Sequence, residues 1–125
     1  MPRPVHFEFA VDDPDRAARF WSEAFGWAIH HWEGPQDYWL VSTGEQGPGI
    51  DGGLARRSDL VQGGTVLTLD VPSTDEATSK VEAAGGAVVM SKSAVPGVGW
   101  LAYCRDTEGT VFGVMENDPS AGRGG

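Results

Sequence analysis

The chain carries one sequence pattern twice, with the second copy sixty residues after the first. Each copy begins with an alternating apolar run, continues through a turn into a stretch with helical spacing, and ends that stretch in glycine. At this offset Ala17 coincides with Ala77, Gly26 with Gly86 and Gly53 with Gly113, whereas His6 coincides with Val66. Such a repeat indicates one supersecondary unit built twice, which restricts the chain to folds with an internal duplication.

The first strand and helix of each copy follow from local spacing. In residues 5–11 the large apolar side chains alternate with His6, Glu8 and Ala10, as in a strand with one face on a core. His6 and Glu8 therefore share the other face. Asp13 and Pro14 then suit the start of an amphipathic helix that runs to Phe25. In the second copy Ser73 and Glu76 form a capping box at the start of the corresponding helix, which spans residues 76–84.

Short β-rich runs follow each helix and complete the unit. They cover residues 27–32, 38–43 and 50–57 in the first copy, and 87–90, 100–105 and 110–115 in the second. The unit is thus βαβββ, twice, which is an α+β fold. We expect one domain over residues 1–117, with modules at about 4–57 and 65–117, a short linker at 58–64, and a flexible tail at 118–125 with nothing to pack.

Several local motifs together resemble the vicinal oxygen chelate superfamily. They are the string His6-Phe7-Glu8, the helix entry Asp13-Pro14-Asp15, and the turn Asp106-Thr107-Glu108-Gly109 before the last strand. The resemblance covers residues 4–117, and the superfamily includes glyoxalase I, extradiol dioxygenases, fosfomycin-resistance transferases and bleomycin-binding proteins. It implies two βαβββ modules that curl into an open cup. It also implies a divalent metal held by one side chain from the first strand and one from the last strand of each module.

Carried onto this chain, the four metal-ligand positions are His6, Gly53, Val66 and Gly113. Only His6 has a donor side chain, whereas divalent-metal sites need several converging donors. We therefore expect no metal cofactor, and keep as the alternative an irregular metal site that also uses Glu8 or Thr68. A lone histidine on a strand is interpreted as a hydrogen-bonded polar residue that faces a cavity, with a catalytic acid or base as the alternative.

The predicted ligand site lines the cup. Glycine at the lost metal positions leaves room for an organic molecule, and aromatic side chains on the strands offer flat contact area. The candidate ligand-binding residues are His6, Glu8, Trp39, Gly53, Thr68, Trp100, Tyr103, Gly113 and Met115.

Composition restricts the partners. Eighteen acidic residues against nine Lys and Arg give a formal net charge of -9, which disfavours nucleic acid. A single cysteine, Cys104, cannot form an intramolecular disulfide. No apolar run approaches the roughly 20 residues of a membrane span, and no signal-peptide pattern opens the chain, so we expect a cytoplasmic protein. A homodimer is expected because an isolated cup would leave strand edges and aromatic side chains exposed.

Two main functional hypotheses follow. In the first, the protein binds a small organic molecule without metal, as bleomycin-resistance proteins of this superfamily do, and binding is its activity. In the second, it is a lyase, isomerase or dioxygenase-type enzyme that uses His6 and Glu8, whose side chains lie about 7 Å apart on one strand face, or an irregular metal site. A regulatory or assembly domain is a third hypothesis that the residues leave open.

Overall fold

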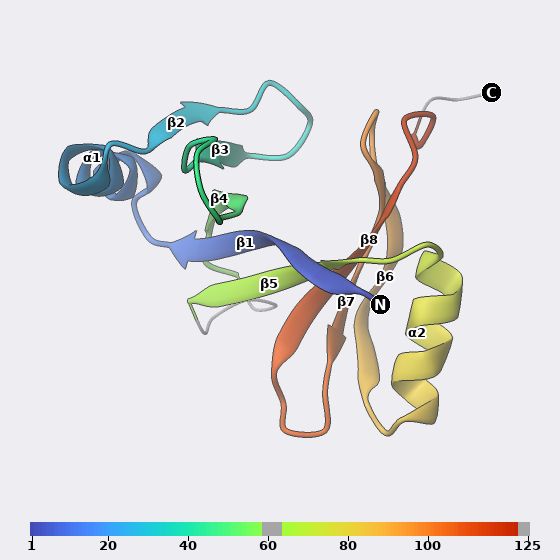
Figure 1. The fold of residues 1–125 in the computed structure, drawn as a ribbon. Helices are drawn as coiled ribbons and strands as arrows, with labels where there is room; N and C mark the ends of the chain where they lie inside the picture. The colour runs from blue at the N-terminus through green and yellow to red at the C-terminus, as the bar shows by residue number, and fades with distance from the viewer. Residues whose placement is uncertain (59–63, 123–125) are drawn as a thin grey trace. The chain divides into compact units, whose positions relative to one another are not determined.

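The computed structural model describes residues 1–58 and 64–122, and it confirms the α+β class and the repeated βαβββ order (Figure 1). The elements are β1 (Arg3–Val11), α1 (Pro14–Phe25), β2 (Ala28–His31), β3 (Tyr38–Ser42), β4 (Asp51–Arg56), β5 (Thr65–Asp70), α2 (Thr74–Ala83), β6 (Ala87–Val95), β7 (Gly99–Arg105) and β8 (Val111–Asn117). They divide into two compact units: a first unit, Val5–Val66, and a second unit, Met1–Pro4 with Leu67–Gly125. Most of the predicted linker, residues 59–63, lies outside the described residues.

The first unit packs α1 against one face of a sheet with the strand order β2-β3-β4-β1. Strands β1 and β4 run parallel, and the other neighbours are antiparallel. The core is built on Phe7, Val41 and Leu54, which are buried on the face toward α1. The helix begins as predicted, because the Asp13 side chain accepts a hydrogen bond from the Arg16 backbone N–H at 3.1 Å.

The second unit repeats this plan with the strand order β5-β8-β7-β6 and α2 on one face. Its core residues are Val71, Ala102 and Val114. The Ser73 hydroxyl accepts from the Glu76 backbone N–H at 3.1 Å, which confirms the predicted cap at the start of α2. Thr74, fully buried, donates its hydroxyl proton to the Trp100 carbonyl and so ties the helix to β7.

Helices α1 and α2 contain 12 and 10 residues. Within the described ranges, the chain has no helix with the length and apolar character that crossing a membrane requires.

The last described residues are packed against the second unit. Ala121 is fully buried, and its carbonyl accepts from the Gly97 N–H. The Trp100 indole N–H donates to the Asp118 carboxylate at 3.0 Å. The expectation of a tail with nothing to pack is therefore wrong for residues 118–122, because the β6–β7 turn supplies partners that spacing along the sequence does not reveal. Residues 123–125 lie outside the described part.

Candidate functional site

Strand register in the first unit gathers polar side chains on the face of the sheet opposite α1. On β1 and β4, His6 pairs with Asp51 and Glu8 pairs with Gly53. On β3 and β4, Leu40 pairs with Gly53 and Tyr38 pairs with Ala55. Paired residues on neighbouring strands point to the same side of a sheet. We call this surface the His6 face; around Gly53 it comprises His6, Glu8, Tyr38, Leu40 and Asp51.

His6 and Tyr38 are joined across the His6 face, although 32 residues separate them in sequence. The imidazole Nε2 and the Tyr38 hydroxyl oxygen form a hydrogen bond of 2.8 Å. The rings are stacked, with centroids 6.3 Å apart and 21° between their planes. Both side chains are half-buried. This confirms that His6 is a hydrogen-bonded polar residue; that it faces a cavity stays a prediction.

The Tyr38 side chain also occupies the space above Gly53. A Cβ atom at Gly53 would overlap the Tyr38 hydroxyl and the ring carbons beside it. Glycine is thus the residue that allows the ring to lie against β4 and reach His6. The expectation that Gly53 leaves open room is wrong in this unit, because an aromatic side chain of the same unit fills that room.

Burial controls the charge of His6. Desolvation of the half-buried ring lowers its pKa from the ordinary value of 6.5, and the Asp51 carboxylate nearby acts in the opposite direction by raising it. The lowered pKa keeps the imidazole neutral at neutral pH. A neutral ring can accept a hydrogen bond from the Tyr38 hydroxyl at Nε2 or donate one to the hydroxyl oxygen, depending on its tautomer.

The residues present do not fit the divalent metal that the resemblance implies. Gly53, Val66 and Gly113 provide no side-chain donor, and the Nε2 atom of His6 already has Tyr38 as its partner. Within residues 1–58 and 64–122, no group of three or more His, Cys, Asp or Glu side chains is placed to hold a metal ion. The position that would supply the ligand from β4 is covered by the Tyr38 ring.

Four predicted site residues share one face of the second unit's sheet. Thr68 pairs with Gly113, Gly113 pairs with Tyr103, and Met115 pairs with Leu101 on the same side. Thr68 and Tyr103 are buried. A Cβ at Gly113 would lie 2.9 Å from the Thr68 hydroxyl oxygen and 3.5 Å from Leu101 Cδ1, so the space beside this glycine is also filled.

The two predicted tryptophans lie on the opposite faces of their sheets. Trp39 packs with the first unit's core below α1, and the Arg56 guanidinium sits 5.4 Å from its ring centroid. Trp100 pairs with Glu116 on the side toward α2, where Lys92 Nζ lies 5.1 Å from its ring centroid. The expectation that Trp39 shares a surface with His6, or Trp100 with Thr68, is wrong because strand parity turns each ring toward its own helix.

Sequence reasoning missed Tyr38 and Leu40. Residues 38–41 read Tyr-Trp-Leu-Val, a continuous apolar run in which no polar alternation shows which side chains face the core. For Trp100 and Tyr103 the sequence did show that both cannot face one ligand site, because residues three apart on one strand fall on opposite faces.

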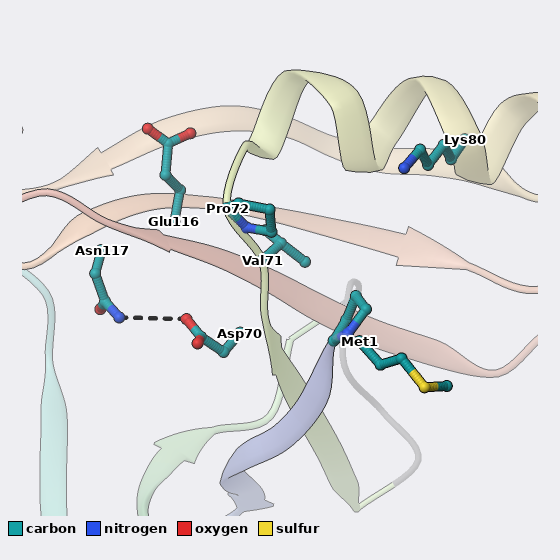
Figure 2. Close-up of a pocket in the computed structure, with 8 residues that line it drawn as sticks. Met1, Asp70, Val71, Pro72, Lys80, Glu116 and Asn117 are labelled. Atoms are coloured by element: carbon teal, nitrogen blue, oxygen red, sulfur yellow. Dashed lines mark hydrogen bonds between the residues drawn. The ribbon is translucent and has the colours of Figure 1, made fainter.

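An open cleft of about 460 Å³ lies in the second unit, lined by Met1 and Pro2, Asp70–Pro72, Lys80, Glu116 and Asn117 (Figure 2). Three of its polar side chains make hydrogen bonds within the unit: Asn117 donates to the Asp70 carboxylate at 3.2 Å, and Glu116 accepts from the Thr74 N–H at 2.9 Å. No predicted site residue lines this cleft.

Solved structures show the same fold at low sequence identity. Methylmalonyl-CoA epimerase from Mycobacterium tuberculosis aligns with a TM-score of 0.67 at 18% identity, over 93% of this chain and 88% of that one. A methylmalonyl-CoA epimerase in complex with methylmalonyl-CoA and NH4+ aligns with a TM-score of 0.67 at 15% identity, over 97% and 98%. A structure from Legionella pneumophila described as an NAD-dependent benzaldehyde dehydrogenase aligns with a TM-score of 0.66 at 14% identity, over 92% and 100%.

Comparison with curated proteins found no match. The model of a protein family, the glyoxalase-like domain, matches residues 6–115. This span runs from the histidine of β1 to Met115 on β8.

Proposed function

Because this chain belongs to the glyoxalase-like domain family, we propose that it binds a small organic molecule on the His6 face without a divalent metal. The observation that carries the proposal is the place of Tyr38. Its ring covers Gly53, the position of the superfamily's metal ligand on β4, and its hydroxyl forms a hydrogen bond with the Nε2 atom of His6. What remains is a half-buried pair of neutral hydrogen-bonding groups beside an apolar residue, Leu40, which suits recognition of an organic ligand.

The charges of this face favour a neutral or cationic ligand. On the His6 face of the first unit, the charged side chains from β1, β3 and β4 are Glu8 and Asp51, and these three strands direct no Lys or Arg to it. A polyanion would meet carboxylates there and no Lys or Arg, so it would be repelled. The acidic face therefore favours a cationic ligand, such as those that bleomycin-resistance proteins bind, over an acyl-CoA.

The proposal also covers predicted ligand contacts in the second unit, the cellular location and the oligomeric state. Thr68, Tyr103, Gly113 and Met115 share a face of the second unit's sheet, and they stay predicted ligand contacts of that unit taken by itself. The neighbour that holds methylmalonyl-CoA is an example of this fold with a small ligand. We propose a cytoplasmic homodimer that does not bind nucleic acid, in keeping with a net charge of -9.

Calorimetric titration in the presence of EDTA tests the binding proposal. Metal-free bleomycin is the cationic probe and methylmalonyl-CoA is the polyanionic probe. We expect saturable binding of the cationic probe that His6→Ala and Tyr38→Phe each weaken by roughly tenfold, since each change removes a hydrogen-bonding group from the face. Gly49→Ala, in the turn before β4, is the matched control and leaves the affinity unchanged.

Three results would overturn this proposal. The cationic probe fails to bind, or it binds only after a divalent metal is added back, or it binds His6→Ala and Tyr38→Phe as tightly as the unchanged protein. Elemental analysis of protein dialysed against nickel, zinc, manganese and iron accompanies the titration. Near-stoichiometric retention that disappears in His6→Ala would show that the chain does hold a metal.

The His6–Tyr38 pair also supports a second candidate function, proton transfer to or from a bound carbon acid. A neutral imidazole hydrogen-bonded to a phenol is a suitable acid and base pair. The test is incorporation of deuterium from ²H₂O into dihydroxyacetone, an uncharged carbon acid that the carboxylates of this face would not repel, read by mass spectrometry. Exchange that His6→Ala abolishes would establish the enzyme, whereas exchange at the rate without protein would refute this candidate.

A further inference from the structure

Strand β3 has no sequence pattern that decides which of its side chains face the core. Residues 38–41 are apolar at every position, and the strand opposite them, β4, carries two glycines there. Register is specified strongly where only one face of a strand is apolar, and weakly in Gly-rich strands. Toward α1 the strand could turn either Trp39 with Val41, as observed, or Tyr38 with Leu40 after a shift of one residue. Something besides apolar packing must therefore select between the two registers.

An acidic residue immediately before this run bonds to the strands on both sides. The Asp37 carboxylate forms a hydrogen bond of 2.9 Å with Nε2 of His31, at the end of β2, and accepts one of 2.9 Å from Nε of Arg56, at the end of β4. The two bonds use different carboxylate oxygens. They lower the pKa of Asp37, with the bond from Arg56 as the larger cause, so this group is charged at neutral pH. We call Asp37, His31 and Arg56 the β3 clamp.

The contacts of the clamp fit the observed register. Tyr38 pairs with Ala55, so in this antiparallel ladder the next pair is Asp37 with Arg56. Asp37 and Trp39 are two residues apart and so share the α1 side of the sheet, where Arg56 Cζ lies 5.4 Å from the Trp39 ring centroid. A shift of β3 by one residue would turn the Asp37 carboxylate to the other side of the sheet, away from both clamp partners.

We propose that Asp37 is a positioning residue: through the β3 clamp it fixes the register that selects Tyr38, rather than Trp39, for the His6 face. Exposed ion pairs add little stability each, but a choice between two similar registers needs only a small difference between them. Asp37 acts on His6 through its strand neighbour Tyr38. The effect of Asp37 on ligand binding rests on the proposed function of the His6 face, whereas its effect on the register does not.

NMR of the ligand-free full chain reads the register directly. In the unchanged protein, nuclear Overhauser contacts should join the Tyr38 ring protons to the Gly53 Hα protons, because the ring lies where a Cβ of Gly53 would be. Asp37→Arg and Arg56→Asp should each weaken these contacts at least about twofold, since each places like charges together in the clamp. Contacts from the Trp39 ring to Gly53 should appear in their place.

A second exposed ion pair supplies the matched control. Asp12 pairs with Nε of Arg57, the residue after the clamp arginine, at 3.0 Å. Asp12→Arg makes the same change of charge as Asp37→Arg, but Asp12 lies outside β3. It should leave the contacts between Tyr38 and Gly53 unchanged.

Charge exchange gives the decisive result, because a misfolded variant cannot produce it. The double variant Asp37→Arg with Arg56→Asp restores an opposite-charge pair at the same two positions. It should regain the contacts between Tyr38 and Gly53 that each single variant loses. The pKa of His6 gives a second reading: loss of the Tyr38 ring uncovers the imidazole, so this pKa should move toward 6.5 in the single variants and fall again in the double variant.

The proposal is overturned if the single charge reversals keep the contacts between Tyr38 and Gly53 at full strength, if Asp12→Arg weakens them equally, or if the double variant does not regain them. Titration with metal-free bleomycin separates the two proposals. An unchanged chain that does not bind this probe, while its variants show the change of register, refutes the proposed function alone. An unchanged chain that binds it, while the single reversals keep their contacts, refutes the positioning role alone.

Discussion

A methyl group at Gly53 has no room beneath the Tyr38 ring. In Gly53→Ala the new Cβ would overlap the Tyr38 hydroxyl and ring carbons, so the ring must move and its hydrogen bond to His6 is lost. Overpacking of this kind costs about 1–3 kcal/mol, and the lost hydrogen bond adds about 0.5–1.5 kcal/mol. We expect the free energy of unfolding to fall by roughly 2–4 kcal/mol.

The same substitution in a Tyr38→Ala background isolates the cause. Without the ring, the three atoms that a Cβ would meet first are gone, and alanine restricts the unfolded chain more than glycine does. The cost of Gly53→Ala should then fall to about zero, which gives a coupling of about 2 kcal/mol or more between the two positions. Gly49→Ala is the control, since its Cβ would meet the Thr43 hydroxyl oxygen at an ordinary 3.9 Å.

Urea unfolding followed by circular dichroism measures the free energy of unfolding of each variant, and one slope of this free energy against urea concentration is used for all of them. The control should stay within about 0.5 kcal/mol of the unchanged protein. If Gly53→Ala costs the same with and without Tyr38, the ring does not lie over Gly53, and the argument against the metal position on β4 fails with it.

Three further predictions concern His6, Cys104 and Ser73. The pKa of His6 is lowered in the folded chain, so below pH 6.5 the unfolded chain binds a proton more readily, and the free energy of unfolding should fall as pH falls from 6.5 toward the folded-state pKa. His6→Gln should remove this pH dependence. Because the Asp51 carboxylate raises the pKa of His6, an NMR titration of Asp51→Asn should show a still lower pKa. Burial raises the pKa of the Cys104 thiol, so a thiol reagent should label the native chain far more slowly than the urea-unfolded chain. Ser73→Ala should cost about 1 kcal/mol in urea unfolding because the Glu76 N–H loses its cap, whereas Ser73→Asp should retain most of it.

Elements whose signals are local could be predicted from the sequence. The alternation in residues 5–11 predicts β1 and the shared face of His6 and Glu8, and the register agrees, since both lie on the side away from Phe7. Asp13 and Ser73 predict the starts of α1 and α2, because an N-cap bonds an amide only three residues away. The sixty-residue repeat predicts the second βαβββ order from the first.

Candidate site residues on the later strands could not be assigned in this way. Tyr38 and Trp39 are adjacent aromatic residues in a run with no polar alternation, and sequence reasoning chose Trp39. The pairing of Leu40 with Gly53 places Tyr38 on the His6 face and turns Trp39 toward α1. A shift of one residue in that pairing would have reversed the two.

By itself, then, the sequence determined the order of elements and the residues that cap the two helices, because each depends on residue type or on neighbours within a few residues. Tertiary structure alone decided that Tyr38 fills the space over Gly53 and bonds His6 from 32 positions away. The physical reason is that the face on which a strand residue lies is set by hydrogen-bond register with other strands, which is a relation between distant segments.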